Sequence, residues 1–307
     1  MTKPDAILVA DLHLREDVPL CRTDDYFQAQ HNKVKWLRKL KRKYECVVIV
    51  AGDIFNHWKP TPYLLSWALK VLPRFHAIPG QHDLPQHRFD LLGKSGFSVL
   101  QNARKLDMII TPDTPFSDLS GDPQESSISI CGYPFGKPFE RPAKRQGTGR
   151  NIAVAHVLTW HNKLPFPGCT SSNALSLLKR YPYDLIVTGD NHIPFVVEYK
   201  GRVLVNPGSM MRMKADQEQH RPRVYLWYAK SNTVKPVYFP IEEGVVSREH
   251  IEERKGQEER FQAFVQKLKE VDEELGLSFK RNLKTYFNKH RVRKEVMDIV
   301  WEAVDEK

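Results

Sequence analysis

The sequence contains few cysteines, and none has the spacing of a metal-binding or redox motif. Its four cysteines, Cys21, Cys46, Cys131 and Cys169, are scattered, and no two are separated by two residues. Reduced thiols are the ordinary state of such isolated cysteines. The sequence therefore does not predict a disulfide-stabilised secreted scaffold.

Long hydrophobic runs are also absent. No apolar run approaches the ~20 residues that a membrane-spanning helix needs. The N-terminal segment MTKPDAILVADLH does not have the shape of a signal peptide. We therefore expect a soluble, cytoplasmic protein with no membrane partner.

Positive charge, in contrast, is abundant. The 307 residues include 47 Lys and Arg against 37 Asp and Glu, a formal net charge of +10. Such an excess favours polyanionic partners, either nucleic acid or an anionic membrane face. With 41% hydrophobic residues the chain has enough apolar surface for a sizeable core, so wholesale disorder is not expected.

Short runs rich in Val and Ile recur along the chain, and polar turns follow them at once. These runs have the length and composition of buried strands. They cover residues 6–10, 46–51, 75–78, 152–155, 184–188 and 202–205, with two further candidates at 223–229 and 234–239. Helical patterns lie between several of them. One has an apolar stripe from Val34 to Tyr44, one covers residues 61–72, and one begins with a cap at Ser171 or Ser172. Strands that alternate with helices predict an α/β layered core.

The character of the chain changes after the last candidate strand. From about residue 247 it reads as helix, with Phe261, Val265 and Leu268 on one apolar face. We therefore predict two domains, a larger one over residues 1–242 and a small helical one over residues 243–307.

The polar turns carry hard metal ligands at one strand end after another. The candidates are Asp11, His13, Asp53, Gln81, His82, Asp83, His156, Asp190 and His192. Each turn alone has a structural explanation as a cap or an ordinary turn. Together they supply what a pair of divalent ions about 3.5–4 Å apart requires, namely carboxylates to offset charge and imidazoles to complete the coordination.

These motifs resemble those of the calcineurin-like metallophosphoesterases. The order Asp-x-His, Gly-Asp, Gly-Asn-His-Asp/Glu, His and Gly-His-x-His is typical of that family. Residues 51–60 and 75–83 are similar to the SbcD-type DNA repair exonucleases, in particular short, phage-type members. The resemblance runs from about residue 5 to 210. It implies a layered β-sandwich flanked by helices, with a small C-terminal helical cap, and a metal-dependent DNA nuclease activity.

The resemblance also implies a role for each ligand. Asp11, His13 and His192 would bind one metal and His156 the other, with Asp53 between them. His82 would stabilise or protonate the leaving oxygen, and Asp83 would orient the His82 ring.

The sequence departs from the family pattern at two positions. Gln81 stands where Asn is usual, and Asp190 stands where His is usual. Gln81 offers the same carbonyl oxygen on a longer side chain, whereas Asp190 adds a negative charge and a harder ligand. The second site would then have mostly oxygen donors, which favours Mn²⁺, or else Mg²⁺, over Zn²⁺.

Two basic segments make DNA the expected substrate. One is the loop 137–150, which includes Lys144 and Arg145. The other is the stretch 279–294, which includes Lys280, Arg281 and Lys284 and has no acid. Contacts of such residues with backbone phosphates would be independent of sequence. A solvated helical face is the alternative explanation of the second segment.

Two other functions stay open at this point, because the fold alone does not choose a substrate. The first is a phosphodiesterase or phosphatase acting on nucleotides or small esters, which DNA would not stimulate. The second is a non-catalytic DNA-binding subunit, which would bind metal and DNA without cleavage. The resemblance further implies two optional partners, an SbcC-like ATPase subunit and a second copy of the chain in a homodimer.

Overall fold

The computed structural model describes residues 3–109, 128–141, 149–164, 168–275 and 279–305. The chain divides into two compact units, Met1–Ser247 and Arg248–Lys307. The sequence placed this boundary near residue 242. Residues 243–247 belong to the first unit because their backbone pairs with it. Val246 bridges to Arg22, and the amide of Ser247 donates to the carbonyl of Cys21 at 2.7 Å.

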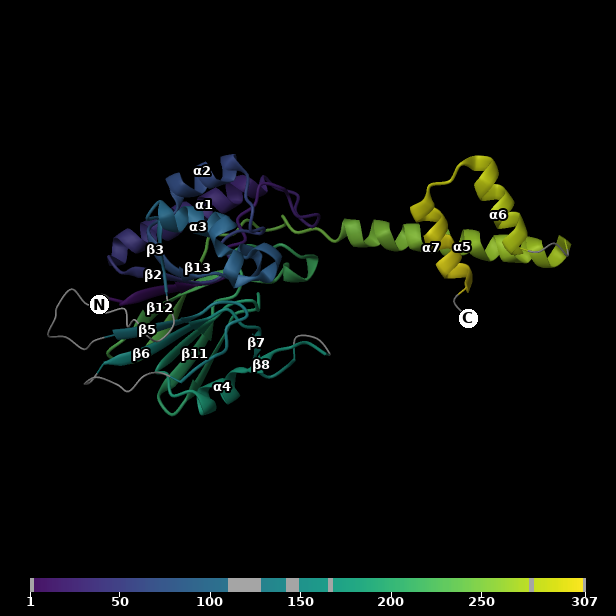
Figure 1. Ribbon diagram of the computed structural model, residues 1–307. Coiled ribbons are helices and arrows are strands. Elements are labelled where there is room, and N and C mark those ends of the chain that lie inside the picture. The colour runs from purple at the N-terminus through teal and green to yellow at the C-terminus, as the bar shows by residue number, and fades with distance from the viewer. Residues whose placement is uncertain (1–2, 110–127, 142–148, 165–167, 276–278, 306–307) are drawn as a thin grey trace. The chain divides into compact units, whose positions relative to one another are not determined.

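Two main sheets form the first unit (Figure 1). The first has the strand order β13-β12-β1-β2-β3-β4, and the second has the order β10-β11-β9-β6-β5. Strands of the first sheet are β1 (Ala6–Val9), β2 (Val47–Ala51), β3 (Phe75–Ile78), β4 (Leu106–Met108), β12 (Arg223–Tyr228) and β13 (Thr233–Tyr238). Strands of the second are β5 (Ile128–Tyr133), β6 (Arg150–Ala155), β9 (Leu185–Thr188), β10 (Phe195–Tyr199) and β11 (Arg202–Asn206). A small separate sheet pairs β7 (Thr159–Trp160) with β8 (Ser172–Asn173).

The central strands are buried on both faces because each face packs against a different layer. In β1, Ala6 and Leu8 belong to the core between the two sheets, whereas Ile7 and Val9 belong to the core beneath the helices. Successive side chains of a strand point to opposite faces, so a continuous apolar run fills both layers. This explains why the strands read as Val- and Ile-rich runs without alternation.

Helices cover the outer faces of both sheets. On the first sheet these are α1 (Tyr26–Tyr44), α2 (Pro62–Val71) and α3 (Gly96–Asn102), and on the second it is α4 (Ala174–Arg180). The side chain of Thr61 caps α2 by accepting from the amide of Leu64, as predicted. Helix α4 is capped by Asn173, so the predicted cap at Ser171 or Ser172 was wrong: both of those residues precede the helix, and Ser172 lies in β8.

The described residues of the first unit also form four short 3₁₀ turns: η1 (Gln81–Asp83), η2 (Pro85–His87), η3 (Phe89–Lys94) and η4 (Ala215–Gln217). The layered α/β sandwich flanked by helices that the sequence predicts is thus confirmed. Most predicted strands agree with the observed ones within two residues at either end.

The second unit consists of α5 (Glu249–Leu275), α6 (Phe279–His290) and α7 (Lys294–Asp305). Leu283, Phe287 and Val300 form its buried core, against which Trp301 and Phe261 pack. No helix within the described ranges is both long and apolar enough to cross a membrane.

One lysine is buried beneath the first unit's surface. Lys33, on the inner side of α1, is 5% exposed, and its Nζ donates to the carbonyl of Met210 at 2.7 Å. Burial, together with the neighbouring Arg22 and Arg212, lowers the pKa of this ammonium to about 7. The ordinary value is 10.5, so the charged form of Lys33 destabilises the folded state.

This burial predicts a stability that changes with pH. Between about pH 7 and 10.5 the unfolded chain binds the proton of Lys33 and the folded chain does not, so the free energy of unfolding rises with pH. Replacing Lys33 with Met should flatten this rise and raise the free energy of unfolding below pH 7 by about 1–4 kcal/mol. Denaturant titrations across this pH range measure both effects. Lys39→Met, an exposed change on the same helix, should leave the pH profile unaltered; a profile unchanged by Lys33→Met would show that another group causes it.

Candidate metal centre

The carboxyl ends of parallel strands gather the predicted ligands. Strands β1, β2 and β3 are parallel neighbours in the first sheet, and β6 and β9 are parallel neighbours in the second. These five strand ends precede all nine candidates: Asp11, His13, Asp53, Gln81, His82, Asp83, His156, Asp190 and His192. Because the two sheets share one core, their carboxyl ends meet at one place.

The backbone at this place adopts conformations that are uncommon outside glycine. Asp11, His13, Asp53 and Asp190 have φ values of 50°, 44°, 53° and 74°. Left-handed backbone costs on the order of 1–3 kcal/mol for such residues and concentrates at functional sites. These turns bring each side chain round from the strand direction into the site.

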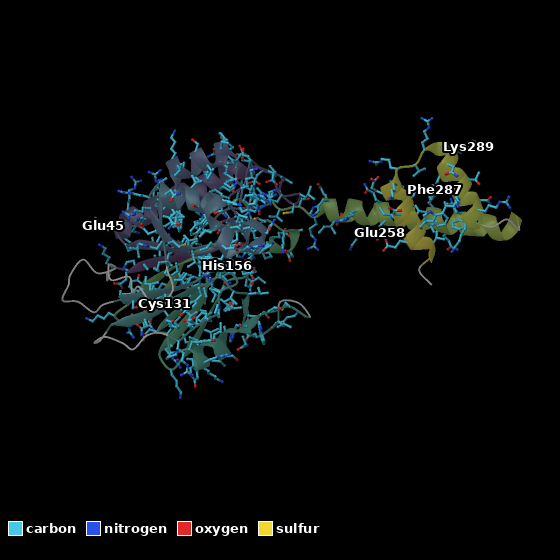
Figure 2. All side chains as sticks on the ribbon, in the orientation of Figure 1. Glu45, Cys131, His156, Glu258, Phe287 and Lys289 are labelled. Atoms are coloured by element: carbon cyan, nitrogen blue, oxygen red, sulfur yellow. The ribbon has the colours of Figure 1, made fainter. Side chains whose placement is uncertain are left out.

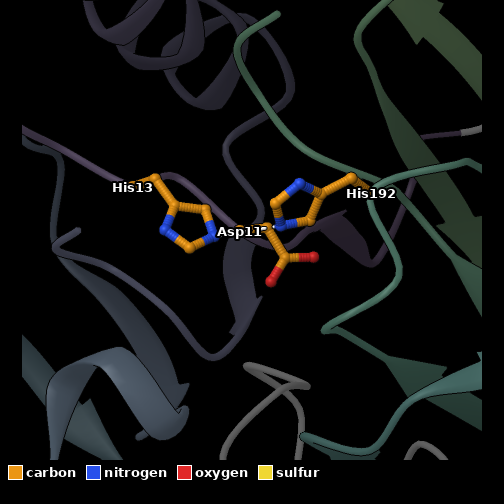
Figure 3. Close-up of side chains that lie close together, drawn as sticks. All are labelled: Asp11, His13 and His192. Atoms are coloured by element: carbon orange, nitrogen blue, oxygen red, sulfur yellow. Dashed lines mark hydrogen bonds between the residues drawn. The ribbon is translucent and has the colours of Figure 1, made fainter. Parts of the chain in front are cut away.

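Three of the predicted ligands, Asp11, His13 and His192, lie close together (Figure 3). Potential ligand atoms of Asp11, His13 and His192 all lie within 4.8 Å of one another. Nε2 of His13 lies 3.1 Å from Nε2 of His192, with the two rings edge to face. Two lone-pair nitrogens at this distance suit either a shared proton or a shared cation.

Asp53 lies between this group and His156. Its Oδ2 is 3.6 Å from Nε2 of His13 and 3.4 Å from Nε2 of His156. Asp11, Asp53 and His156 form a second close set of ligand atoms, and His13, Asp53 and His82 form a third. Asp53 therefore lies between the imidazoles of His13 and His156.

Glycines hold His156 and Asp53 in place by close contact. A Cβ on Gly52, which has φ +89°, would lie 2.1 Å from Nδ1 of His156. A Cβ on Gly189 would lie 2.7 Å from the same atom, and one on Gly80 would lie 2.1 Å from Oδ1 of Asp53. Only glycine at these three positions leaves room for the ligand side chains.

The donor set fits a divalent cation. Nδ1 of His156 donates to the carbonyl of Ala51 at 2.7 Å, so Nε2 of the neutral ring is an acceptor that faces the Asp53 carboxylate. Two acceptors repel unless a proton or a metal ion lies between them. Buried atoms without a hydrogen-bond partner in the described part of the chain include Asp11 Oδ2, His13 Nδ1, Asp53 Oδ2, Gln81 Oε1 and His156 Nε2.

The pKa values of the buried histidines shift in opposite directions. Burial lowers the pKa of His156, but the carboxylates of Asp53 and Asp11 more than offset this and raise it to about 10. Burial lowers the pKa of His13 to about 3 and, with the nearby Lys214, that of His192 to about 4. His13 and His192 are therefore neutral near pH 7, as metal-binding imidazoles must be.

The two residues that depart from the family pattern lie together. Nε2 of Gln81 donates to Oδ1 of Asp190 at 2.6 Å, and the backbone amide of Asp190 donates to Oδ1 of Asp11 at 3.1 Å. This leaves the buried Oε1 of Gln81 as a neutral oxygen donor. The substitutions thus occur as a pair in contact.

The predicted contact between Asp83 and the His82 ring is wrong. The Asp83 carboxylate accepts from the backbone amides of Ile54, Phe55 and Gly80 at 3.0–3.2 Å, and it is fully buried. Nδ1 of His82 lies instead 2.9 Å from the carbonyl of Asn56. In a 3₁₀ turn successive side chains point in different directions, which separates these two neighbours.

The Asp83 carboxylate thus fixes the loop that follows β2 and does not orient the His82 ring. Burial, together with the charge of Asp53, raises the pKa of Asp83 to about 7, although the three amide donors oppose the rise. Asn56, which sequence reasoning did not single out, takes the orienting position through its main chain. No side-chain pattern could have indicated a backbone carbonyl.

Asn206 is a second residue whose role the sequence did not indicate. Its Nδ2 donates to the carbonyls of Asn191 and Ile193 at 2.6 and 2.8 Å, so it anchors both sides of His192. Ser209 adds a bond from its amide to the carbonyl of His192 at 3.2 Å. The turn 206–209 follows a strand like the other polar turns, and that signal could have drawn attention to it.

A cavity of about 750 Å³ opens onto the ligand cluster. It is lined by Gln81, His82, Leu158, Asp190, Asn191, His192, Ile193, Lys214, Asp216, Gln217 and His220. His82 and His192 belong both to this lining and to the ligand sets, so a substrate in the cavity reaches the ligands. Figure 2 shows His156 well inside the first unit.

The predicted DNA-binding residues fall into two groups. Lys144 and Arg145 lie outside the described residues. Lys280, Arg281 and Lys284 lie exposed on α6 and together line a cavity of about 550 Å³ in the second unit, with Phe287 and Trp301 among its apolar walls.

Family comparison agrees with this geometry. Residues 5–227 match the model of the calcineurin-like phosphoesterase superfamily domain. The match covers most of the chain, and the protein is therefore a member of the calcineurin-like phosphoesterases, a family of metal-dependent hydrolases. A comparison with curated proteins gives no match.

Solved structures with a similar fold include TT1561 of Thermus thermophilus, with 12% identity and a TM-score of 0.46 over 77% of this chain and 99% of that one. Phosphopantetheinyl hydrolase from Mycobacterium tuberculosis has 14% identity and a TM-score of 0.42, over 76% and 96%. A novel archaeal phosphodiesterase has 11% identity and a TM-score of 0.40, over 76% and 99%. At these scores the likenesses add nothing on substrate.

Proposed function

We propose that the protein is a two-metal nuclease that hydrolyses phosphodiester bonds in DNA. The observation that carries the hydrolytic part is the position of Asp53 between His13 and His156, with unpaired ligand atoms on both sides. The residues that would hold the ions are Asp11, His13, Asp53, Gln81, His156, Asp190 and His192. When bound, such ions offset charge on the phosphoryl oxygens and activate water.

His82 is the proposed proton donor to the leaving oxygen. Its Nδ1 faces the carbonyl of Asn56 and is therefore the protonated nitrogen that holds the ring in place, which leaves Nε2 to serve the substrate. Water attacks phosphorus in line as the bond to the leaving oxygen breaks and gives up a proton to solvent. His82 in its imidazolium form passes the proton on Nε2 to the leaving oxygen. His82 lines the cavity, within reach of a bound ester.

Oxygen donors in the second site favour Mn²⁺ as the working metal. Gln81 offers its Oε1 and Asp190 its carboxylate, beside Asp53 and the single imidazole of His156. Carboxylate and carbonyl oxygens suit Mn²⁺ and Mg²⁺, whereas imidazole suits Zn²⁺.

Cations around the site support a polyanionic substrate. Lys214 lines the main cavity, and a second cavity of about 350 Å³ is lined by Arg15 and Lys59, with Glu16 and Asp17, and by Asn56, the residue that contacts His82. The net charge of +10 acts in the same direction. An ATPase subunit and a homodimer stay predictions.

The proposal is tested with end-labelled single- and double-stranded DNA beside a chromogenic phosphodiester, each with Mn²⁺, Mg²⁺ or Zn²⁺. We expect DNA cleavage that is fastest with Mn²⁺, and a shift of preference toward Zn²⁺ in Asp190→His. Asp53→Asn is the inactive control, since it removes the charge between the two sites. Rapid ester cleavage without DNA cleavage would identify a small-ester phosphodiesterase, and DNA binding without any cleavage would identify a non-catalytic subunit.

The His82 assignment predicts a loss of rate without a loss of metal. His82→Ala should lower kcat on DNA by roughly 10²–10⁴, the range of a lost general acid, while calorimetry shows metal affinity near that of the unchanged protein. His57→Ala, an exposed histidine nearby, serves as the matched control. Metal loss in parallel with activity would make His82 a ligand, which its proximity to His13 and Asp53 also permits.

The basic face of α6 predicts a change in the salt dependence of DNA binding. Replacing Lys280, Arg281 and Lys284 with Gln should reduce the slope of log K against log salt by up to about 2.7 for duplex DNA, at about 0.9 per phosphate contact. Cleavage of the small ester should persist, since every proposed ligand lies in the first unit. The matched control replaces three exposed cations of α1, Lys35, Arg38 and Lys39. Equal slopes for both triple variants would make the α6 face a solvated helix surface.

A further inference from the structure

Three cations are buried together in the first unit, outside the metal centre. Arg22, Lys33 and Arg212 are 9%, 5% and 4% exposed, and all three line a cavity of about 220 Å³. Burial of even one charge is costly unless an opposite charge compensates it. A cluster of three therefore calls for a matching set of anions.

The protein supplies only part of that compensation. Arg22 pairs with Asp24, its Nε donating to Oδ1 at 2.7 Å, and its Nη1 donates to the carbonyl of Arg212. Asp24 is thus hydrogen-bonded to one cation of the three, and its charge also acts on Lys33 and Arg212. Glu242 also lines the cavity, but its side chain is exposed, and it is its main-chain oxygen that accepts from Nη2 of Arg212.

Donor groups at the cavity are left over. Nε of Arg212 is buried and has no hydrogen-bond partner among the residues that the structure describes. The Lys33 ammonium has three protons to donate. Within the described residues, one hydrogen bond of this group goes to the carbonyl of Met210. Burial lowers the pKa of Arg212, and Arg22 lowers it further, as at Lys33, so the cations repel one another.

The cluster is connected to the metal centre through Met210. Met210, whose carbonyl accepts from Lys33, donates its amide to the carbonyl of Asp11 at 3.1 Å. The same chain segment continues through Arg212 to Lys214 and Gln217, which line the active-site cavity. A ligand among the cations would contact a segment that also lines the active site.

We propose that the cavity of Arg22, Lys33 and Arg212 binds a phosphate-class oxyanion at a site separate from the metal centre. A tetrahedral oxyanion has the charge that the cluster lacks and enough acceptors for the remaining donors of Lys33 and Arg212. Guanidinium and ammonium groups are the side chains that recognise phosphate. Inorganic phosphate and the phosphate group of a mononucleotide share this chemistry. The site does not depend on the substrate proposed above.

The test measures the thermal midpoint Tm of the full chain in the Asp53→Asn background, which weakens phosphate binding at the metal centre. Inorganic phosphate at millimolar concentration should raise Tm by about 2–4 °C relative to chloride at equal ionic strength. Adding Lys33→Met should abolish this rise, and adding Lys39→Met should preserve it. Arg212→Gln provides a second variant, and phosphorus NMR line broadening a second measurement, should Lys33→Met not fold.

The outcomes separate the possibilities. A phosphate response lost with Lys33→Met and kept with Lys39→Met supports the site, and comparison with a mononucleotide then identifies which source of phosphate binds better. A response that is equal in both double variants, or absent from the Asp53→Asn protein, overturns the proposal. In that case the cations are a structural network whose spare donors water satisfies.

Discussion

The site depends on one buried carboxylate held between two imidazoles. Asp53 faces His13 on one side and His156 on the other, with ligand nitrogens 3.6 and 3.4 Å from its Oδ2. Three glycines make this possible, because any side chain at Gly52, Gly80 or Gly189 would occupy the space of the ligands. The arrangement is unfavourable without a cation, since its acceptors face one another in a buried place. The fold thus holds these acceptors in a geometry that a proton or bound cations would satisfy.

The two-sheet architecture supplies the ligands of this arrangement from strands that pack against each other. Ligands from β1 and β2 enter from one sheet, and His156 and His192 enter from the other, so the site is fixed by two rigid layers with a common core. The loop of His192 is the exception, because it lies beyond its strand. Asn206 and Ser209 hydrogen-bond to the main chain of this loop, which holds the His192 imidazole next to that of His13.

The sequence predicted what local patterns control. Polar turn residues directly follow each of the strands β1, β2, β3, β6 and β9 in the sequence. The order of these motifs alone therefore indicated a shared site. It could not indicate partners brought together by folding, such as the carbonyl of Asn56 beside His82 or Lys214 beside His192. Asp83 was misassigned because it neighbours His82 in the chain, whereas the 3₁₀ turn directs its carboxylate to the amides of Ile54, Phe55 and Gly80.

The most direct test of this account is to locate the ions themselves. A crystal grown with Mn²⁺ and measured at the manganese absorption edge should show two anomalous peaks about 3.5–4 Å apart. Asp53 should contact both ions, with His13 and His192 on one and His156 on the other. A single peak, or a pair that Asp53 does not join, would contradict the two-metal centre on which the proposed function rests.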